Sequence, residues 1–174
     1  MKDFIYCQRD IPKDKWRYGL RSSAATGCGW IATYNALLLM GYKAFPQSII
    51  RYFEKQLPVL NGNTDTFVLG PAMFFKQQGF SVSTTTRRKD FDSLAKQSDV
   101  NIVYFWWRNG FKIGAHFVAV KYTDKGFVGY NTYRQSKGPD YYGHSLDAFM
   151  KEKGYFGALL TGIKNKNNKR EEIL

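Results

Sequence analysis

Cys28 is the residue of this sequence with the clearest potential for chemistry. It lies between Gly27 and Gly29 and opens an apolar segment, so we expect it in the first turn of a buried helix. The amides and dipole of a helix N-terminus favour the thiolate, which is the nucleophilic form of cysteine. The two glycines would let a substrate backbone approach and leave the Cys28 amide able to donate to an oxyanion. The sequence therefore indicates a thiol nucleophile, with simple packing of a buried cysteine as the alternative.

A thiol nucleophile needs a base, and the chain has two histidines, His116 and His144. His116 opens an apolar run, in which a strand would hold its backbone rigidly and let the ring point out of the end of a sheet. His144 lies next to Ser145, which we interpret as a helix cap, so we expect His144 in a surface turn. The pattern favours His116 as the base, and a core position without a catalytic role is the alternative.

The base in turn needs a partner that fixes its tautomer, and Asn131 is the candidate. It follows His116 by 15 residues and lies in the next expected strand. If its side-chain oxygen accepts from one ring nitrogen, the other nitrogen faces the sulfur. Asparagine is disfavoured in strands, which supports a functional reason, and an exposed edge position is the alternative. Asp124 and Asp140 are the fallback partners, although both resemble turn residues.

The elements that would position these residues change in kind along the chain. Helices are predicted over residues 28–40, 47–56, 71–79, 90–97 and 145–153, and strands over 80–86, 100–107, 115–123, 127–134 and 155–163. Helices followed by strands that short turns connect predict the α+β class with an antiparallel sheet. No linker divides the chain, so we predict one domain over residues 1–163 and a charged tail over 164–174.

The hairpin around Asp124 and Lys125 decides whether Asn131 shares a face with His116. In an antiparallel pair the numbers of opposite residues have a constant sum, and successive side chains change face. A two- or four-residue loop gives a sum of 249 and a shared face, whereas a three-residue loop with a bulge at Gly126 gives 250 and opposite faces. We predict the odd sum, or a further bulge that restores it, because the chemistry requires the shared face.

The composition limits the classes of protein to consider. The 174 residues, 44% of them hydrophobic, suffice for one core, and two cysteines with two histidines indicate neither a disulfide framework nor a zinc site. We therefore expect no metal or cofactor, and expect Cys7 to be neither catalytic nor bonded to Cys28. No segment has the roughly 20 apolar residues of a membrane helix, and the first ten residues do not form a secretory signal. These features predict a soluble protein that is cytoplasmic by default, with export by another route as the alternative.

The net charge of +12 and the 30 aromatic residues are compatible with single-stranded nucleic acid. Much of the excess charge, however, lies in residues 164–170 and in scattered single lysines, as in a solvated tail. We therefore expect a peptide or protein substrate rather than a nucleic acid.

Four short segments, at residues 26–30, 114–120, 129–131 and 145–149, make the chain similar to a known group. Their order and the order of Cys28, His116 and Asn131 resemble the papain-like cysteine peptidase superfamily, in particular the compact bacterial double-glycine leader peptidases. His116 follows Cys28 by 88 residues, a spacing similar to that in small members, and the resemblance covers residues 20–163. It implies a central helix that carries the cysteine and packs on an antiparallel sheet.

Two positions depart from this pattern. The family usually has a glutamine about six residues before the nucleophile, whose amide completes the oxyanion hole, and here that position is Ser22. A hydroxyl donates only one hydrogen bond, so Gln8 is a second candidate for this donor, beside the amide of Cys28. Trp30 occupies a position where leader peptidases more often have proline or a small residue.

These residues predict a cysteine peptidase or amidase that hydrolyses a peptide or isopeptide bond through an acyl-enzyme. One alternative keeps the same triad but transfers the acyl group to an amine. The other is a degenerate, non-catalytic module that binds peptide or nucleic acid through its basic surface.

Overall fold

The N-terminal part of the chain is built around one apolar helix, α2 (Cys28–Leu39). In this computed structural model, which describes residues 4–56 and 66–166, every residue of α2 except Leu39 is buried. A helix that is apolar all round must be covered on all sides. Two helices, α3 (Pro46–Glu54) and α4 (Gly70–Gln77), and one face of a sheet cover it. The chain leaves α2 through Gly41, whose φ of 91° is favourable for glycine.

Several short elements precede α2. They are η1 (Gln8–Asp10), β1 (Arg17–Tyr18), β2 (Arg21–Ser22) and α1 (Ser23–Thr26). Only Gly27 separates α1 from α2, and its amide donates to the carbonyl of Ser23 at 2.9 Å, as in a helix. The amide of Ile31 donates to the carbonyl of Gly27 at 3.0 Å. The two helices therefore form one nearly continuous helical segment.

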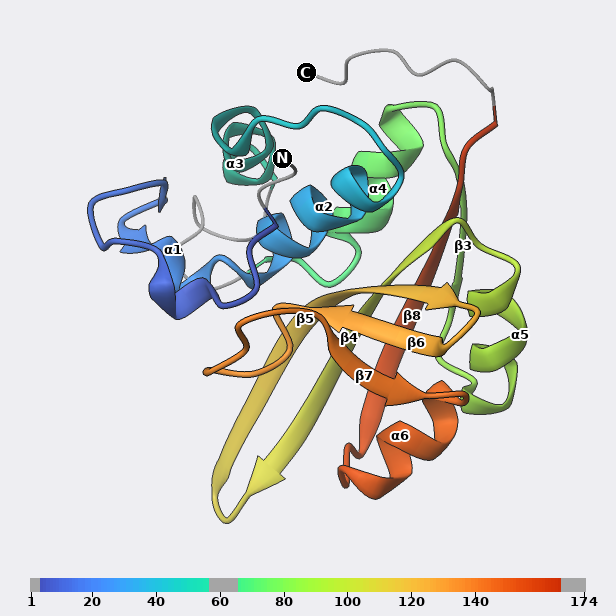
Figure 1. Cartoon of the computed structure of the whole chain (residues 1–174). Helices are drawn as coiled ribbons and strands as arrows, with labels where there is room; N and C mark the ends of the chain where they lie inside the picture. Colours follow the sequence, from blue (N-terminus) through green and yellow to red (C-terminus); the bar gives the residue numbers. More distant parts are fainter. Residues whose placement is uncertain (1–3, 57–65, 167–174) are drawn as a thin grey trace.

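The second part of the chain forms a six-stranded sheet in which all neighbouring strands are antiparallel, in the order β3-β8-β4-β5-β6-β7. The strands are β3 (Ser81–Thr85), β4 (Val100–Asn109), β5 (Lys112–Thr123), β6 (Gly126–Tyr130), β7 (Asp140–Gly143) and β8 (Gly157–Lys164). The helices α5 (Phe91–Lys96) and α6 (Leu146–Glu152) connect them, and η3 (Arg88–Asp90) precedes α5. Figure 1 shows α2, α3 and α4 grouped on one side of this sheet, with α6 on the other.

The two faces of the sheet support separate cores. Along β5, Phe117 and Ala119 pack with the residues of α2, whereas Val118 and Val120 pack with those of α5 and α6. Side chains alternate between the faces of a strand with period two. The side chain of His116 therefore lies on the same face of the sheet as that of Val118, opposite to the face that packs against α2.

The α+β class, the buried helix and the antiparallel sheet agree with the prediction from the sequence. One strand was predicted too long: β6 ends at Tyr130, not at Arg134, and β7 was not predicted. The expected C-terminal tail covers residues 164–174. Its first residue, Lys164, is the last residue of β8, and residues 167–174 lie outside the described part of the chain. Within residues 4–56 and 66–166, no helix has the length and apolar character needed to cross a membrane.

Candidate active site

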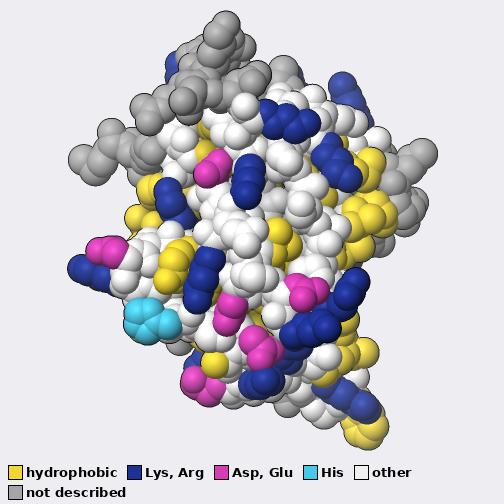
Figure 2. Space-filling view, turned by 90° about the vertical axis from the view of Figure 1, so that its right-hand side faces the viewer, with side chains coloured by type: hydrophobic (Ala, Val, Ile, Leu, Met, Phe, Trp, Pro, Cys, Tyr) yellow, Lys and Arg dark blue, Asp and Glu magenta, His cyan; other side chains and the backbone are white. Residues whose placement is uncertain are grey.

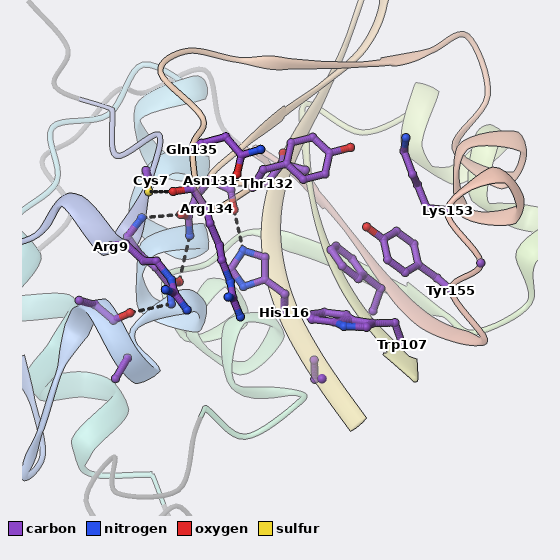
Figure 3. A pocket seen from close by; sticks show the side chains of 18 of the residues that line it. Cys7, Arg9, Trp107, His116, Asn131, Thr132, Arg134, Gln135, Lys153 and Tyr155 are labelled. Atoms are coloured by element: carbon purple, nitrogen blue, oxygen red, sulfur yellow. Dashed lines mark hydrogen bonds between the residues drawn. The ribbon is translucent and has the colours of Figure 1, made fainter. Parts of the chain in front are cut away.

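A cavity of about 860 Å³ lies between the N-terminal segment, α1, β4, β5 and the segments that follow β6 and α6 (Figure 3). This volume is in the range of pockets that bind small ligands or short chain segments. Among the lining residues are His116, Asn131 and Gln8, and the walls also include the rings of Phe105, Trp107, Tyr133 and Tyr155. The cavity is therefore the place where the predicted base and its predicted partner meet.

The imidazole of His116 is held by a hydrogen bond. Its Nε2 lies 2.6 Å from the backbone carbonyl oxygen of Asn131. A carbonyl oxygen only accepts, so Nε2 carries the proton and the neutral ring has its lone pair on Nδ1. The ring of Phe105 lies beside the imidazole, with ring centroids 6.0 Å apart and an interplanar angle of 75°. The geometry thus fixes both the tautomer and the orientation of the His116 ring.

The surroundings of His116 also influence its charge. Burial of the ring lowers its pKa from 6.5, since desolvation disfavours the charged form, while the hydrogen bond to the Asn131 carbonyl opposes this by stabilising the protonated ring. The pKa of His116 therefore lies below its ordinary value, and at neutral pH the ring is neutral. A neutral imidazole with Nδ1 unprotonated can accept a proton from a thiol.

Asn131 holds His116 through its main chain, whereas we expected its side chain to do so. Asn131 directly follows β6 and has a φ of 67°, a left-handed conformation that asparagine tolerates better than most residues. Its side chain points to Gln8: Oδ1 accepts from the Gln8 amide at 2.8 Å, and Nδ2 donates to Gln8 Oε1 at 3.3 Å. The left-handed turn directs the carbonyl, instead of the side chain, at the ring.

The register of the β5–β6 hairpin is the predicted one. Thr123 pairs with Gly126 and Ala119 with Tyr130, so the paired numbers add up to 249 and the loop consists of Asp124 and Lys125. Asn131 follows directly after the last pair, at the end of the strand next to His116. The odd sum therefore brings the two residues together, although the contact uses a different atom of Asn131.

Gln8 connects three parts of the cavity wall. Besides its two contacts with Asn131, its Nε2 donates to the carbonyl of Ala24 in α1 at 3.2 Å. Ser22, the other candidate for the second oxyanion donor, precedes α1 and is not one of the residues that line the cavity. Of these two candidates, only Gln8 lines the cavity that contains His116, and its side-chain amide is already hydrogen-bonded.

Cys28 begins α2, as predicted, but it does not line the cavity. Its side chain is 6% exposed and packs in the core around α2. Ala24 and Ala25 do line the cavity, and they lie one helical turn before Cys28 in the α1–α2 segment. The structure thus gathers His116, Asn131 and Gln8 in one cavity and places Cys28 in the next turn of one of its walls.

The glycines that flank Cys28 have a packing role that differs from the expected one. A side chain on Gly29 would overlap Thr66, and one on Gly27 would meet the carbonyl of Ser23 and the indole nitrogen of Trp30. The space beside these glycines is therefore occupied by the protein itself, whereas the sequence suggested that it serves the approach of a substrate.

The other residues considered from the sequence lie away from the base. Asp124 is in the hairpin loop and accepts from the amide of Lys125, while Asp140 is in β7 and accepts from the hydroxyl of Ser136 at 2.6 Å. Neither lines the cavity. His144 is exposed, with its ring near that of Tyr141. The surface position expected for His144 agrees with the structure.

Cys7 was not expected at the site but lines the cavity. It is 4% exposed, and its thiol donates to the carbonyl of Arg134 at 2.9 Å. Neither Cys7 nor Cys28 forms a disulfide. No group of three or more histidine, cysteine or acidic side chains that could hold a metal occurs among the described residues.

Four basic side chains in the lining were also missed: Arg9, Arg108, Arg134 and Lys153. They come from segments far apart in the chain, so no local pattern of the sequence could have connected them.

Comparisons with known proteins do not identify a family for this chain, so its class can be described only from its fold and its cavity. No protein-family model matches the sequence, and no curated protein matches it. What the structure defines is an α+β protein with a histidine-centred, basic cavity beside the start of its buried helix.

Proposed function

We propose that the chain is a thiol hydrolase of the papain-like type, which cleaves a peptide or isopeptide bond with Cys28 as nucleophile and His116 as general base and acid. The observation that carries this proposal is the hydrogen bond from His116 Nε2 to the Asn131 carbonyl inside the cavity. It leaves Nδ1 as the basic nitrogen, and it holds the ring in the cavity that Ala24 and Ala25, one helical turn before Cys28, also line.

In the proposed reaction Nδ1 takes the proton of the Cys28 thiol, and the sulfur attacks the carbonyl carbon of the substrate. The amide of Cys28 donates to the oxyanion that forms, and protonated His116 gives its proton to the leaving amine. Water, deprotonated by His116, then attacks the thioester, releases the carboxylic acid and restores the thiol. For this the Cys28 sulfur must come within hydrogen-bond distance of Nδ1, which substrate binding can complete because catalytic contacts often tighten only in the complex.

The first test measures the reactivity of Cys28 in a Cys7→Ser variant, so that one thiol remains. Serine keeps a hydroxyl that can donate to the Arg134 carbonyl, as the Cys7 thiol does. The rate of alkylation by iodoacetamide is measured as a function of pH. We expect its midpoint for Cys28 to lie well below pH ~8.5, the ordinary pKa of a thiol, and we expect His116→Gln to raise this midpoint. A midpoint near the ordinary value in both backgrounds would contradict the proposal.

The second test looks for turnover. Incubation of the protein with a diverse peptide mixture should give cleavage products in mass spectrometry, and Cys28→Ala and His116→Ala should each abolish them. Because nucleophile and base act as one unit, the double variant should be no worse than either single variant. Added amines separate hydrolysis from acyl transfer, since a transferase would yield amine conjugates instead of free acids.

One observation favours a second candidate, a non-catalytic module that binds peptides. Cys28 is outside the lining of the cavity, whereas four cations are part of it. Ordinary reactivity of Cys28, combined with selective binding of peptides, would support this module.

A further inference from the structure

The cavity around His116 has an unbalanced charge. Its lining contains the four cations Arg9, Arg108, Arg134 and Lys153, and no aspartate or glutamate. They come from η1, β4, the segment between β6 and β7, and the segment between α6 and β8. Figure 3 shows Arg9 and Arg134 on one side of the His116 ring, and Lys153 on the other with Trp107 and Tyr155. The fold therefore brings positive charges from four segments to one cavity.

Three of these cations have no acidic partner within the described part of the chain. Residues 4–56 and 66–166 provide no carboxylate within ion-pair distance of Arg9, Arg108 or Arg134. Lys153 lies 3.3 Å from Glu152, in a pair that is largely exposed to solvent. An exposed pair of this kind contributes little to stability, so Lys153 can exchange its partner readily.

Some basic side chains outside the cavity are paired with acids. Arg88 binds Asp147 at 2.9 Å, and Lys137 binds Asp10 at 2.8 Å. Figure 2 shows basic and acidic side chains mixed over the face of the molecule that it presents. The lining of the cavity, by contrast, contains no carboxylate.

From this geometry we infer that the cavity binds an acidic polypeptide segment, which carries carboxylates next to the bond that the proposed hydrolase would cleave. Arginine offers a planar fork of donors that matches a carboxylate, and the cavity provides three of them. The rings of Trp107 and Tyr155 provide apolar walls for the stems of the substrate side chains. The charges would also attract such a segment over a distance, with a dependence on salt.

The choice of a polypeptide over a nucleic acid rests on the proposed function. A thiol that acts with a histidine attacks the acyl carbon of a peptide bond, whereas the sugar-phosphate backbone of a nucleic acid contains no acyl carbon. The basic side chains also surround one concave cavity, whose volume of about 860 Å³ suits a short segment. A binding experiment can include both polymers and decide between them.

The experiment measures binding to the full-length Cys28→Ala variant by fluorescence anisotropy, so that no turnover occurs. The probes are a labelled peptide with four glutamates, the same peptide with glutamines, and a labelled single-stranded oligonucleotide. We expect the glutamate peptide to bind at least about tenfold more tightly than the glutamine peptide, and to be released as sodium chloride rises from about 0.05 to about 0.5 M. Equal binding of the two peptides would overturn the inference, and preference for the oligonucleotide would replace the polypeptide by a nucleic acid.

A pair of charge variants tests the location of the binding site. Arg9 and Arg134 are exposed, so the double change to glutamine should leave the fold intact, which circular dichroism verifies. Loss of two exposed ionic contacts should weaken binding of the glutamate peptide about fivefold or more. The matched control is a double change of Arg51 in α3 and Arg17 in β1, which removes two exposed charges outside the cavity. If the control weakens binding as much as the cavity variant, the cavity is not the binding site.

The outcomes for this inference and for the proposed function are separate. Ordinary reactivity of Cys28 with retained charge selectivity would reject the hydrolase and keep the acidic ligand. A reactive Cys28 without charge selectivity would keep the hydrolase and reject the acidic ligand.

Discussion

The ring of His116 donates a hydrogen bond to the backbone carbonyl of Asn131, while the side chain of Asn131 binds Gln8. Asn131 thus holds the His116 ring through its left-handed backbone. Its side chain has a different task, since it ties the N-terminal segment to the end of β6. Substitutions can separate these two tasks.

Asn131→Gly and Asn131→Ala form the first comparison. Both variants lose the side-chain hydrogen bonds to Gln8. Glycine adopts a positive φ readily, whereas alanine is strained in that conformation. We expect the alanine variant to be about 0.5–1 kcal/mol less stable than the glycine variant in urea unfolding, after allowance for the flexibility of glycine in the unfolded chain. The glycine variant should also keep more of the Cys28 reactivity. Equal stability of the two variants would show that the backbone conformation of Asn131 is not what matters.

Gln8→Ala and Ser22→Ala form the second comparison, between the two candidate oxyanion donors. The side chain of Gln8 donates to Ala24 and accepts from Asn131. Ser22 makes no side-chain capping bond to α1. At about 1 kcal/mol for each hydrogen bond, Gln8→Ala should cost about 1–2 kcal/mol of stability, and Ser22→Ala should cost little. Equal losses in urea unfolding would contradict the role of Gln8 as the link between α1 and β6.

The third prediction concerns pH. Burial lowers the pKa of His116 below 6.5 in the folded protein, so the unfolded chain binds a proton first as the pH falls. The contribution of neutral His116 to the free energy of unfolding is therefore complete above about pH 6.5. It is lost as the pH falls from there toward the lower pKa of the folded state. The free energy of unfolding changes by at most about 1.4 kcal/mol per pH unit in this range.

Urea unfolding between pH 7.5 and 5 measures this effect. The stability of His116→Gln should fall less with acidification than that of the unchanged protein, whereas His144→Gln, which removes the exposed histidine, should follow the unchanged protein. Parallel curves for all three proteins would show that His116 has the same proton affinity in the folded and unfolded states.

The parts of the fold that the sequence predicted depend on local signals. An apolar run closed by Gly41 predicts α2. The register of the β5–β6 hairpin is an exception, because the local sequence also allows a three-residue loop and the odd sum was predicted from the requirement that Asn131 and His116 share a face. The parts that it did not predict depend on a single backbone angle or on distant segments. The left-handed φ of Asn131 ends β6 early, and no local pattern marks it. The cations of the cavity meet only after the chain folds, since Arg9 and Lys153 come from opposite ends of the sequence.

The position of Cys28 was also predicted only in part from the sequence. Its place at the start of α2 follows from the sequence, because glycines and an apolar run surround it. Whether its side chain faces the cavity or the core depends on how α1 continues into α2 and on which residues cover that turn. Ala24 and Ala25 face the cavity there, and Cys28 packs in the core.

Gly29→Ala gives the last prediction, because it tests the packing that surrounds Cys28. Alanine in place of glycine in a helix normally stabilises by up to about 1 kcal/mol. Here the added methyl group would overlap the Oγ1, Cβ and Cγ2 atoms of Thr66, so we expect a loss of about 1–3 kcal/mol in urea unfolding. Gly138→Ala, where a methyl group meets no atom within 4 Å, should change stability by less than about 0.5 kcal/mol.

A Thr66→Gly background completes this test. If Thr66 is the obstacle, Gly29→Ala should cost less in that background than in the unchanged protein, and the difference measures the coupling between the two positions. An unchanged cost would mean that Thr66 does not occupy the space next to Gly29. In that case the glycine beside Cys28 would be left with the role first expected from the sequence, which is to let a substrate backbone approach the thiol.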